Sequence, residues 1–180
     1  MILKDEKVRL LTPGELNIEL EVEENGETYL ENSLKKARAF HQASGLPVLA
    51  DDSGLEVDWL GGQPGIHSRR FLPNPDASSH ERCLYLLSRL KDYPKPWKAH
   101  FNCVAVLYLT EERWKSSCGQ IYGEISEAFS GNQGFGFDPI FFIPELKQTM
   151  AELLPNQKNQ ISHRALALLN FTELFEWLQS

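Results

Sequence analysis

The sequence predicts an α/β fold in which a mixed β-sheet is flanked by helices. Segments with helical periodicity alternate along the chain with short apolar runs typical of strands. Two Ser/Thr-x-x-Glu capping boxes mark helix starts between those runs. The 180 residues are 42% hydrophobic, enough for a core of their own, and no repeat or long linker divides them. We therefore expect one domain spanning residues 1–180.

The first third of the chain predicts a strand, an acidic segment and a helix. Residues 8–11 form a short apolar run closed by Pro13-Gly14. Acidic residues then alternate with apolar ones over residues 18–27, which is typical of an extended, half-buried segment. The capping box Thr28-x-x-Glu31 starts a helix that Gly45 ends. Its apolar side is expected to comprise Leu30, Leu34, Ala37 and His41.

The middle of the chain predicts a buried strand and a second helix. Residues 47–50 form a short strand that ends at Asp51-Asp52-Ser53-Gly54, where the two last residues favour a turn. Ser78-x-x-Glu81 starts the second helix. Its inner face is expected to comprise Cys83, Leu84, Leu87 and Leu90.

The last third predicts a hairpin, a strand and a final helix. Residues 101–109 and 114–124 read as two strands joined by a turn, and residues 137–143 as a further strand. Thr149-x-x-Glu152 predicts a helical turn that Pro155 interrupts. Ser162 is expected to cap the final helix, whose apolar stripe comprises Ala165, Leu168, Leu169, Phe175 and Leu178.

The net charge and the cysteine usage limit the classes of binding partner and the cellular compartment that we expect for this protein. The net charge of −7 lacks the positive footprint of a nucleic-acid-binding protein but leaves room for a small phosphate ligand. No apolar run is long enough to cross a membrane. The first residues lack the pattern of a signal peptide, so we expect neither a signal peptide nor a membrane partner. The odd number of cysteines, with no CxxC pair, fits a reducing cytoplasm.

The pair Asp51-Asp52 is a candidate catalytic site because it follows a buried strand, where the backbone is held and the side chains are presented. Neighbouring carboxylates on extended backbone point in different directions, so one can face a metal or water while the other organises the chain. An acid from residues 19–27 that reached Asp52 would complete a hard-oxygen site for Mg²⁺. The alternatives are a simple Asx turn and a solvated acidic face.

Two further motifs are candidates for ligand contacts. In the loop from Gly134 to Pro139, Phe135 and Phe137 could clamp a flat heteroaromatic ring while Asp138 or backbone amides read its edge; alternatively, both phenylalanines belong to the core. Ser162-His163-Arg164 lies at a predicted helix start, where cations oppose the helix dipole. An external phosphate or carbonyl would explain them, together with nearby Lys158; the alternative is a set of solvated side chains.

Taken together and in order, these motifs resemble the inosine triphosphate pyrophosphatase family. The resemblance rests on Glu23-Glu24-Asn25-Gly26, Glu31-Asn32, Ala50 to Leu55, Gly61 to Gly65, Gly134 to Pro139 and Ser162-His163-Arg164. It runs from the acidic segment nearly to the end of the chain. The family hydrolyses non-standard purine nucleoside triphosphates.

The resemblance implies roles for individual residues. Asp52 matches the general base, which also touches the metal, and Glu23 matches the metal-binding glutamate, with Glu24 as its counterpart if the register shifts by one. Ser53 matches a substrate contact beside the base. The base-recognition loop corresponds to Phe135, Gly136, Phe137 and Asp138, and the remaining nucleotide contacts to Lys158, His163 and Arg164.

These roles imply an Mg²⁺-dependent enzyme that converts ITP, dITP or XTP to the monophosphate and pyrophosphate. Arginine is a donor only, so Arg164 suits a 6-keto oxygen better than the 6-amino group of adenine. The resemblance also implies a homodimer.

The chain departs from the family pattern at its start. The usual N-terminal strand and helix, with a [Ser/Thr]-Gly-Asn-x-x-Lys phosphate-binding stretch between them, do not occur before the acidic segment. This departure leaves an alternative function: a catalytically impaired member that binds nucleotides without turnover. A pyrophosphatase for modified pyrimidine nucleotides is a weaker alternative.

Overall fold

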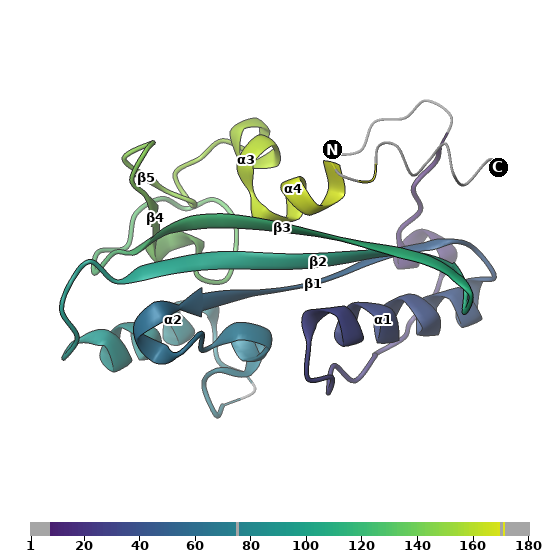
Figure 1. The fold of residues 1–180 in the computed structure, drawn as a ribbon, viewed down its shortest axis with the longest axis horizontal. Helices are drawn as coiled ribbons and strands as arrows, with labels where there is room; N and C mark the ends of the chain where they lie inside the picture. Colours follow the sequence, from purple (N-terminus) through teal and green to yellow (C-terminus); the bar gives the residue numbers. More distant parts are fainter. Residues whose placement is uncertain (1–7, 75, 170, 172–180) are drawn as a thin grey trace. The chain divides into compact units, whose positions relative to one another are not determined.

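The computed structural model describes residues 8–74, 76–169 and 171, which fold into helices and strands (Figure 1). The α-helices are α1 (Tyr29–Ser44), α2 (Ser79–Leu90), α3 (Pro155–Ile161) and α4 (His163–Leu169). The strands are β1 (Val48–Val57), β2 (Lys98–Thr110), β3 (Arg113–Ile125), β4 (Phe141–Ile143) and β5 (Gln148–Thr149). They form one five-stranded sheet in the order β1-β2-β3-β4-β5, which confirms the α/β class. The pairs β3–β4 and β4–β5 are antiparallel.

The chain divides into two compact units. The first comprises Met1–Asp52, Cys103–Gly119 and His163–Ser180, and the second Ser53–Asn102 and Gln120–Ser162. Strands β1, β2 and β3 each contribute residues to both. Phe175 and Leu178, predicted on the last helix, lie outside the described residues.

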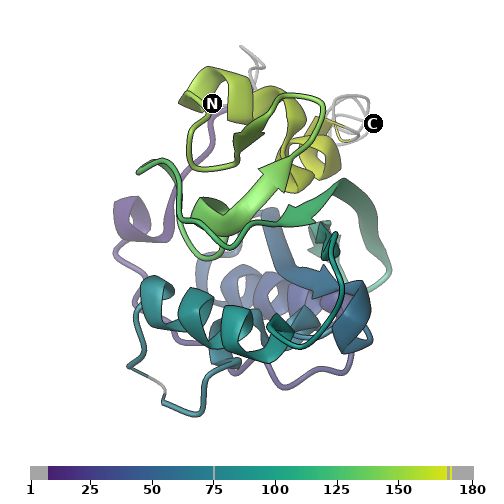
Figure 2. The same ribbon diagram turned by 90° about the vertical axis from the view of Figure 1, so that its left-hand side faces the viewer.

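In the first unit, helices pack on both faces of the sheet. Successive side chains of a strand point to opposite faces. Val106 and Tyr108 of β2 pack against Leu34 and Ala37 of α1, whereas the intervening face, with Leu107, packs against Ala167 of α4. Figures 1 and 2 show α1 and α4 on opposite sides of these strands.

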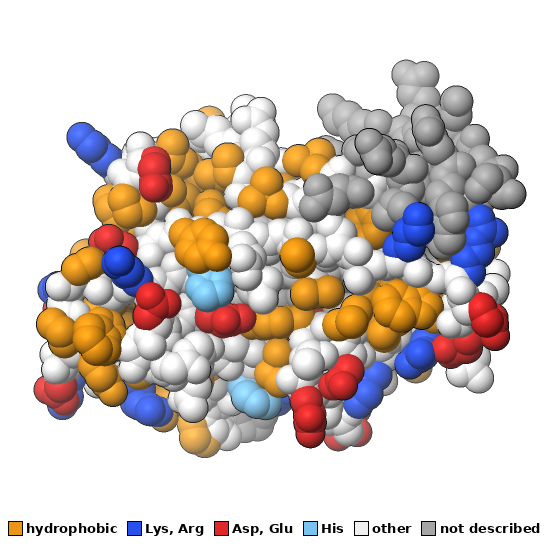
Figure 3. Space-filling view, viewed as in Figure 1, with side chains coloured by type: hydrophobic (Ala, Val, Ile, Leu, Met, Phe, Trp, Pro, Cys, Tyr) orange, Lys and Arg blue, Asp and Glu red, His pale blue; other side chains and the backbone are white. Residues whose placement is uncertain are grey.

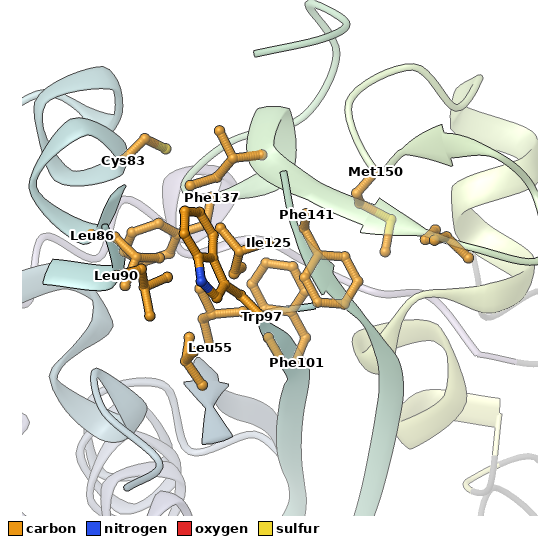
Figure 4. Close-up of a cluster of buried hydrophobic side chains, with 14 of the residues drawn as sticks. Leu55, Cys83, Leu86, Leu90, Trp97, Phe101, Ile125, Phe137, Phe141 and Met150 are labelled. Carbon is orange, nitrogen blue, oxygen red and sulfur yellow. The ribbon is translucent and has the colours of Figure 1, made fainter. Parts of the chain in front are cut away.

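The second unit has its own apolar core (Figure 4). Cys83, Leu86 and Leu90 of α2 pack on strand residues, with Trp97 and Phe141 among the large buried side chains. Leu84, predicted on the inner face of α2, is 48% exposed. That prediction is wrong, because the buried positions are Cys83, Leu86 and Leu90, with spacings of three and then four residues.

Local capping signals predicted both long helices correctly. The Thr28 hydroxyl accepts a hydrogen bond from the backbone N–H of Glu31, and the Glu31 carboxylate accepts one from the backbone N–H of Thr28. Ser78 and Glu81 form the same reciprocal pair at the start of α2. Gly45 ends α1 with a φ of +68°, a conformation that suits glycine. The predicted hairpin is also confirmed, as β2 and β3.

One predicted strand and three predicted boundaries are wrong. Residues 8–11 form no strand, and Pro13–Leu16 form a 3₁₀ turn. Strand β1 continues through Asp51 to Val57 instead of ending in a turn. Pro139 confines the strand predicted over 137–143 to β4, preceded by the 3₁₀ turn Asp138–Ile140. Pro155 begins α3 instead of interrupting a helix, since proline lacks only an N–H that the first turn leaves unpaired.

Within the described ranges, no helix has both the length and the apolar character needed to span a bilayer. On the face shown in Figure 3, charged side chains of both signs are interspersed among hydrophobic ones.

The cysteines provide a test of the second unit's packing. Cys83 and Cys103 are fully buried and Cys118 is exposed. Burial raises the pKa of the Cys83 thiol from 9.0 to about 12, with Asp138 adding to the rise and Arg82 opposing it. We expect iodoacetamide at pH 8 to label one thiol per native chain, at Cys118, and all three in denaturant. Rapid native labelling at Cys83 would contradict this packing.

The same raised pKa predicts how stability changes in alkali. Above pH 9.0 the Cys83 thiol ionises in the unfolded chain, whereas the folded chain keeps its proton up to about pH 12. The unfolded state then binds fewer protons, so stability falls as the pH rises through this window. Urea denaturation at pH 8 and pH 10.5 measures the loss, which a Cys83→Ser variant should reduce.

Candidate active site

The first cluster of candidate residues surrounds Asp52, in the first unit. Asp52 lies near the middle of β1 and is 7% exposed. The Asn32 side-chain amide donates to Asp52 Oδ2 at 3.1 Å. The ammonium group of Lys36 lies 3.3 Å from Asp52 Oδ1 and 2.9 Å from Glu24 Oε2. Two carboxylates from distant segments therefore share one lysine.

Burial is the largest influence on the pKa of Asp52. Loss of solvent raises the pKa of its carboxyl, and the neighbouring Glu24 carboxylate adds to the rise. Lys36 and the hydrogen bond from Asn32 oppose it. The net effect is a raised pKa, which brings the carboxylate closer to the range in which a general base works well at neutral pH.

Glu24, and not Glu23, is the acidic residue that the structure brings to this cluster. Glu23 is exposed, whereas Glu24 is partly buried beside Lys36. Alternation along the extended segment 18–26 turns neighbouring side chains to different sides. The geometry thus favours Glu24, the alternative that a shift of one residue allows, as the partner of Asp52.

The donor set around Asp52 fits a magnesium ion. Glu24 and Asp52 already converge on a cation, the Lys36 ammonium, and both supply hard carboxylate oxygens. Mg²⁺ is typically held by one or two carboxylates together with substrate phosphates and waters. Across residues 8–74, 76–169 and 171, no three His, Cys, Asp or Glu residues gather closely enough to hold a metal alone. With Glu24 and Asp52 as its protein ligands, a magnesium ion would take its other ligands from phosphate oxygens and waters.

Asp51 has a different role from Asp52, as expected for neighbours on a strand. Its Oδ2 accepts from Arg164 Nε at 3.0 Å and lies 3.0 Å from Arg164 Nη2, so one carboxylate oxygen meets two donors of the guanidinium. The Cys103 thiol also approaches this oxygen, at 3.6 Å. Arg164 thus has an acceptor inside the protein, and an external ligand is not needed to explain a cation at the start of α4. The adjacent His163 is buried.

A cavity of about 600 Å³ borders this cluster within the first unit. Lys36 and Asp51 line it, together with mostly apolar side chains from residues 8–18 and 46–50. No sequence motif predicted this cavity. Because its walls are mainly apolar, the cavity offers a charged ligand fewer polar contacts than the cluster around Asp52 does.

The second cluster is the loop from Gly134 to Asp138, in the second unit. Asp138 is 2% exposed. Its Oδ2 accepts the backbone N–H of Phe135 at 2.7 Å and also contacts the Lys158 ammonium. Lys158 lies 4.9 Å from the centre of the Phe135 ring. Asp138 therefore holds the loop in shape, and Lys158, like Arg164, is paired with an internal carboxylate.

The two phenylalanines of this loop have different environments. Phe135 is 59% exposed and Phe137 only 3%, since Phe137 belongs to the apolar core. The expectation of two rings available to clamp a ligand is wrong for Phe137, for which the core alternative holds. The carbonyl of Gly136 accepts from the Cys83 thiol at 3.4 Å, which ties the loop to α2. Ser53 follows Asp52 in β1 and is partly exposed.

Sequence reasoning missed Asn32 and Lys36 as members of the Asp52 cluster. Both lie on α1, four residues apart, so they share a side of the helix. That spacing was visible, but only the packing of α1 against the sheet shows that this side faces Asp52.

The comparisons with known proteins agree with these motifs. A family model described as the Ham1 family matches residues 1–174. A dITP/XTP pyrophosphatase of Clostridium perfringens is 45% identical over 175 residues, covering 93% of this chain and 85% of that protein. One from Desulforamulus reducens is 41% identical over 180 residues, covering 98% and 88%.

Solved structures are similar as well. A HAM1 protein from Coxiella burnetii matches with a TM-score of 0.88 and 36% identity, over 97% of this chain and 89% of that one. The Ham1 protein of Staphylococcus aureus matches with a TM-score of 0.79 and 39% identity, over 87% and 81%. With the family model spanning nearly all of its residues and relatives above 40% identity along most of its length, this chain belongs to the Ham1 family.

Proposed function

We propose that this chain is a nucleoside triphosphate pyrophosphatase that converts dITP, ITP and XTP to the monophosphate and pyrophosphate, with Mg²⁺ as its metal. The observation that carries the proposal is the buried Asp52 carboxylate, paired through Lys36 with Glu24. It occurs in a chain 45% identical to a protein named dITP/XTP pyrophosphatase. The proposal also includes a homodimer, as the family resemblance implies, and a cytoplasmic location, as the cysteine usage predicts.

Asp52 would act as the general base. Its carboxylate would take a proton from the water that attacks the α-phosphorus, and pyrophosphate would leave. Asn32 and Lys36 each hold one oxygen of this carboxylate and so restrict its orientation. Lys36 also supplies positive charge close to where phosphate oxygens would bind.

Glu24 and Asp52 would hold the magnesium ion, with Glu23 as the alternative ligand on the same segment. When bound, the metal would offset the negative charge of the phosphates. Ser53, next to the base, would contact the substrate.

The loop at Gly134 and the start of α4 would supply contacts to the nucleotide. The exposed ring of Phe135 offers a stacking face, and the backbone at Gly136 can be approached closely. Asp138 would act by holding this loop and Lys158 in place. His163 and Arg164 would complete the contacts; Arg164, oriented by Asp51, would donate to a 6-keto oxygen.

A substrate panel tests this function. We expect pyrophosphate release from ITP, dITP and XTP with Mg²⁺, at kcat/KM values at least about tenfold above those for ATP, since a donor facing a 6-amino group would be left unpaired. Chelation by EDTA should abolish release, and added Mg²⁺ should restore it. Calorimetric binding of ITP without turnover would instead identify the impaired nucleotide-binding member, and preference for a modified pyrimidine would identify the third alternative.

A further inference from the structure

Asn32 links two segments that the proposed chemistry requires, and it is fully buried. Its side-chain oxygen accepts the backbone N–H of Gly26 at 2.8 Å, at the end of the acidic segment. Its side-chain nitrogen donates to Asp52 Oδ2 at 3.1 Å. One amide group therefore connects the acidic segment to the carboxylate on β1.

The chemistry of its two partners determines which way the amide faces. The Gly26 N–H can only donate, so it requires the amide oxygen, and the ionised Asp52 carboxylate can only accept, so it requires the NH₂ group. Neither aspartate nor leucine, which are close to asparagine in size, satisfies both partners. Aspartate would place a carboxylate against a carboxylate, and leucine would leave both partners without this contact.

The contact also explains the glycine at position 26. A Cβ atom added there would lie 2.7 Å from Asn32 Oδ1 and 2.8 Å from the Glu31 Cβ. Both distances are shorter than side chains tolerate, so the acidic segment can approach Asn32 this closely only with glycine. Glu24, two residues earlier, is thereby held near Lys36 and Asp52.

We infer that Asn32 is a positioning residue that holds the Asp52 carboxylate and the acidic segment in the arrangement needed for pyrophosphate release. It fixes the oxygen of Asp52 that Lys36 does not contact, so the two residues together restrict rotation of the carboxylate. Small displacements of a catalytic group cost about 10²-fold in rate. This inference rests on the proposed function and adds a residue for which the family resemblance implied no role.

The test compares Asn32→Ala with Ser33→Ala. Ser33 is the next residue of α1 and is equally buried. Its hydroxyl donates to the Val104 carbonyl at 2.7 Å. Ser33→Ala therefore removes a hydrogen bond that serves packing and does not involve Asp52. We expect Asn32→Ala to lower kcat for ITP by about 10- to 100-fold, with KM changed by less than about threefold. Ser33→Ala should lose comparable thermal stability yet keep kcat within about twofold of the wild-type value.

A second readout is independent of catalysis and metal. Hydrogen exchange at the Gly26 amide, measured by NMR without nucleotide, should be faster in Asn32→Ala than in Ser33→Ala and the wild type. Asn32→Asp separates the two contacts, because its carboxylate can still accept the Gly26 N–H but cannot donate to Asp52. It should keep the Gly26 amide protected and still lose kcat.

The outcomes that overturn the inference are specific. Wild-type kcat in Asn32→Asp, or equal kcat in the Asn32→Ala and Ser33→Ala variants, would show that Asn32 serves packing alone. If Asn32→Ala does not fold, Gly26→Ala tests the same contact from the other side and should lower kcat. Turnover by the wild type with an inactive Asp52→Asn variant supports the proposed function independently, so a failure confined to Asn32 is a failure of this inference only. A wild-type chain without turnover would instead overturn the proposed function.

Discussion

The Asp52→Asn variant is expected to lower kcat for pyrophosphate release from ITP by about 10³-fold, within the range of 10²- to 10⁴-fold that a positioned general base contributes. The substitution keeps the size of the side chain and removes its ability to take a proton. It also removes the charge that Lys36 and a magnesium ion would share. Steady-state rates at saturating ITP and Mg²⁺ measure the effect.

Stability separates loss of chemistry from loss of fold in this variant. Burial raises the pKa of Asp52, so the fold disfavours its ionised form. A neutral asparagine should therefore leave the melting temperature unchanged or higher, while Lys36 keeps its contact with Glu24. Asp58→Asn is a suitable control, since Asp58 is exposed and lies just beyond β1. Equal rates for Asp52→Asn and the wild type would reject Asp52 as the base.

The Gly134→Ala variant is expected to raise KM for ITP by about tenfold to 100-fold with a smaller change in kcat. Gly134 has a φ of +81°, and an added Cβ would lie 2.1 Å from Asp138 Oδ2 and 2.7 Å from Lys158 Nζ. Asp138 would have to release the Phe135 N–H and Lys158, and loss of such buried polar contacts costs about 1–3 kcal/mol each. The loop would then no longer present Phe135 as it does here.

Gly45→Ala is the matched control for backbone strain. Gly45 also has a positive φ, of +68°, but an added Cβ there meets nothing within 4 Å. This variant should lose about 1 kcal/mol of stability through strain alone and keep KM for ITP. If Gly134→Ala binds ITP as tightly as Gly45→Ala does, the loop at Gly134 does not recognise the nucleotide.

Some features of the fold were predictable because their signals are local. A capping box joins residues three apart, so Thr28 with Glu31 and Ser78 with Glu81 marked helix starts without reference to the rest of the chain. The extent of β1 was not predictable in this way. Residues Asp51 to Gly54 have the composition of a turn, yet they form part of a strand because pairing along the sheet outweighs local preference.

In the candidate site too, some features follow from neighbouring residues and others depend on tertiary packing. The sequence by itself determined that Asp51 and Asp52 have different partners, since consecutive side chains of an extended strand point to opposite sides. Only the tertiary structure decided what those partners are: Arg164, 113 residues from Asp51, and Asn32, 20 residues from Asp52. It also decided that Phe137 is buried and Phe135 exposed. The physical reason is that side-chain pairing and burial between distant segments depend on how helices pack against the sheet, whereas caps and strand alternation depend only on neighbouring residues.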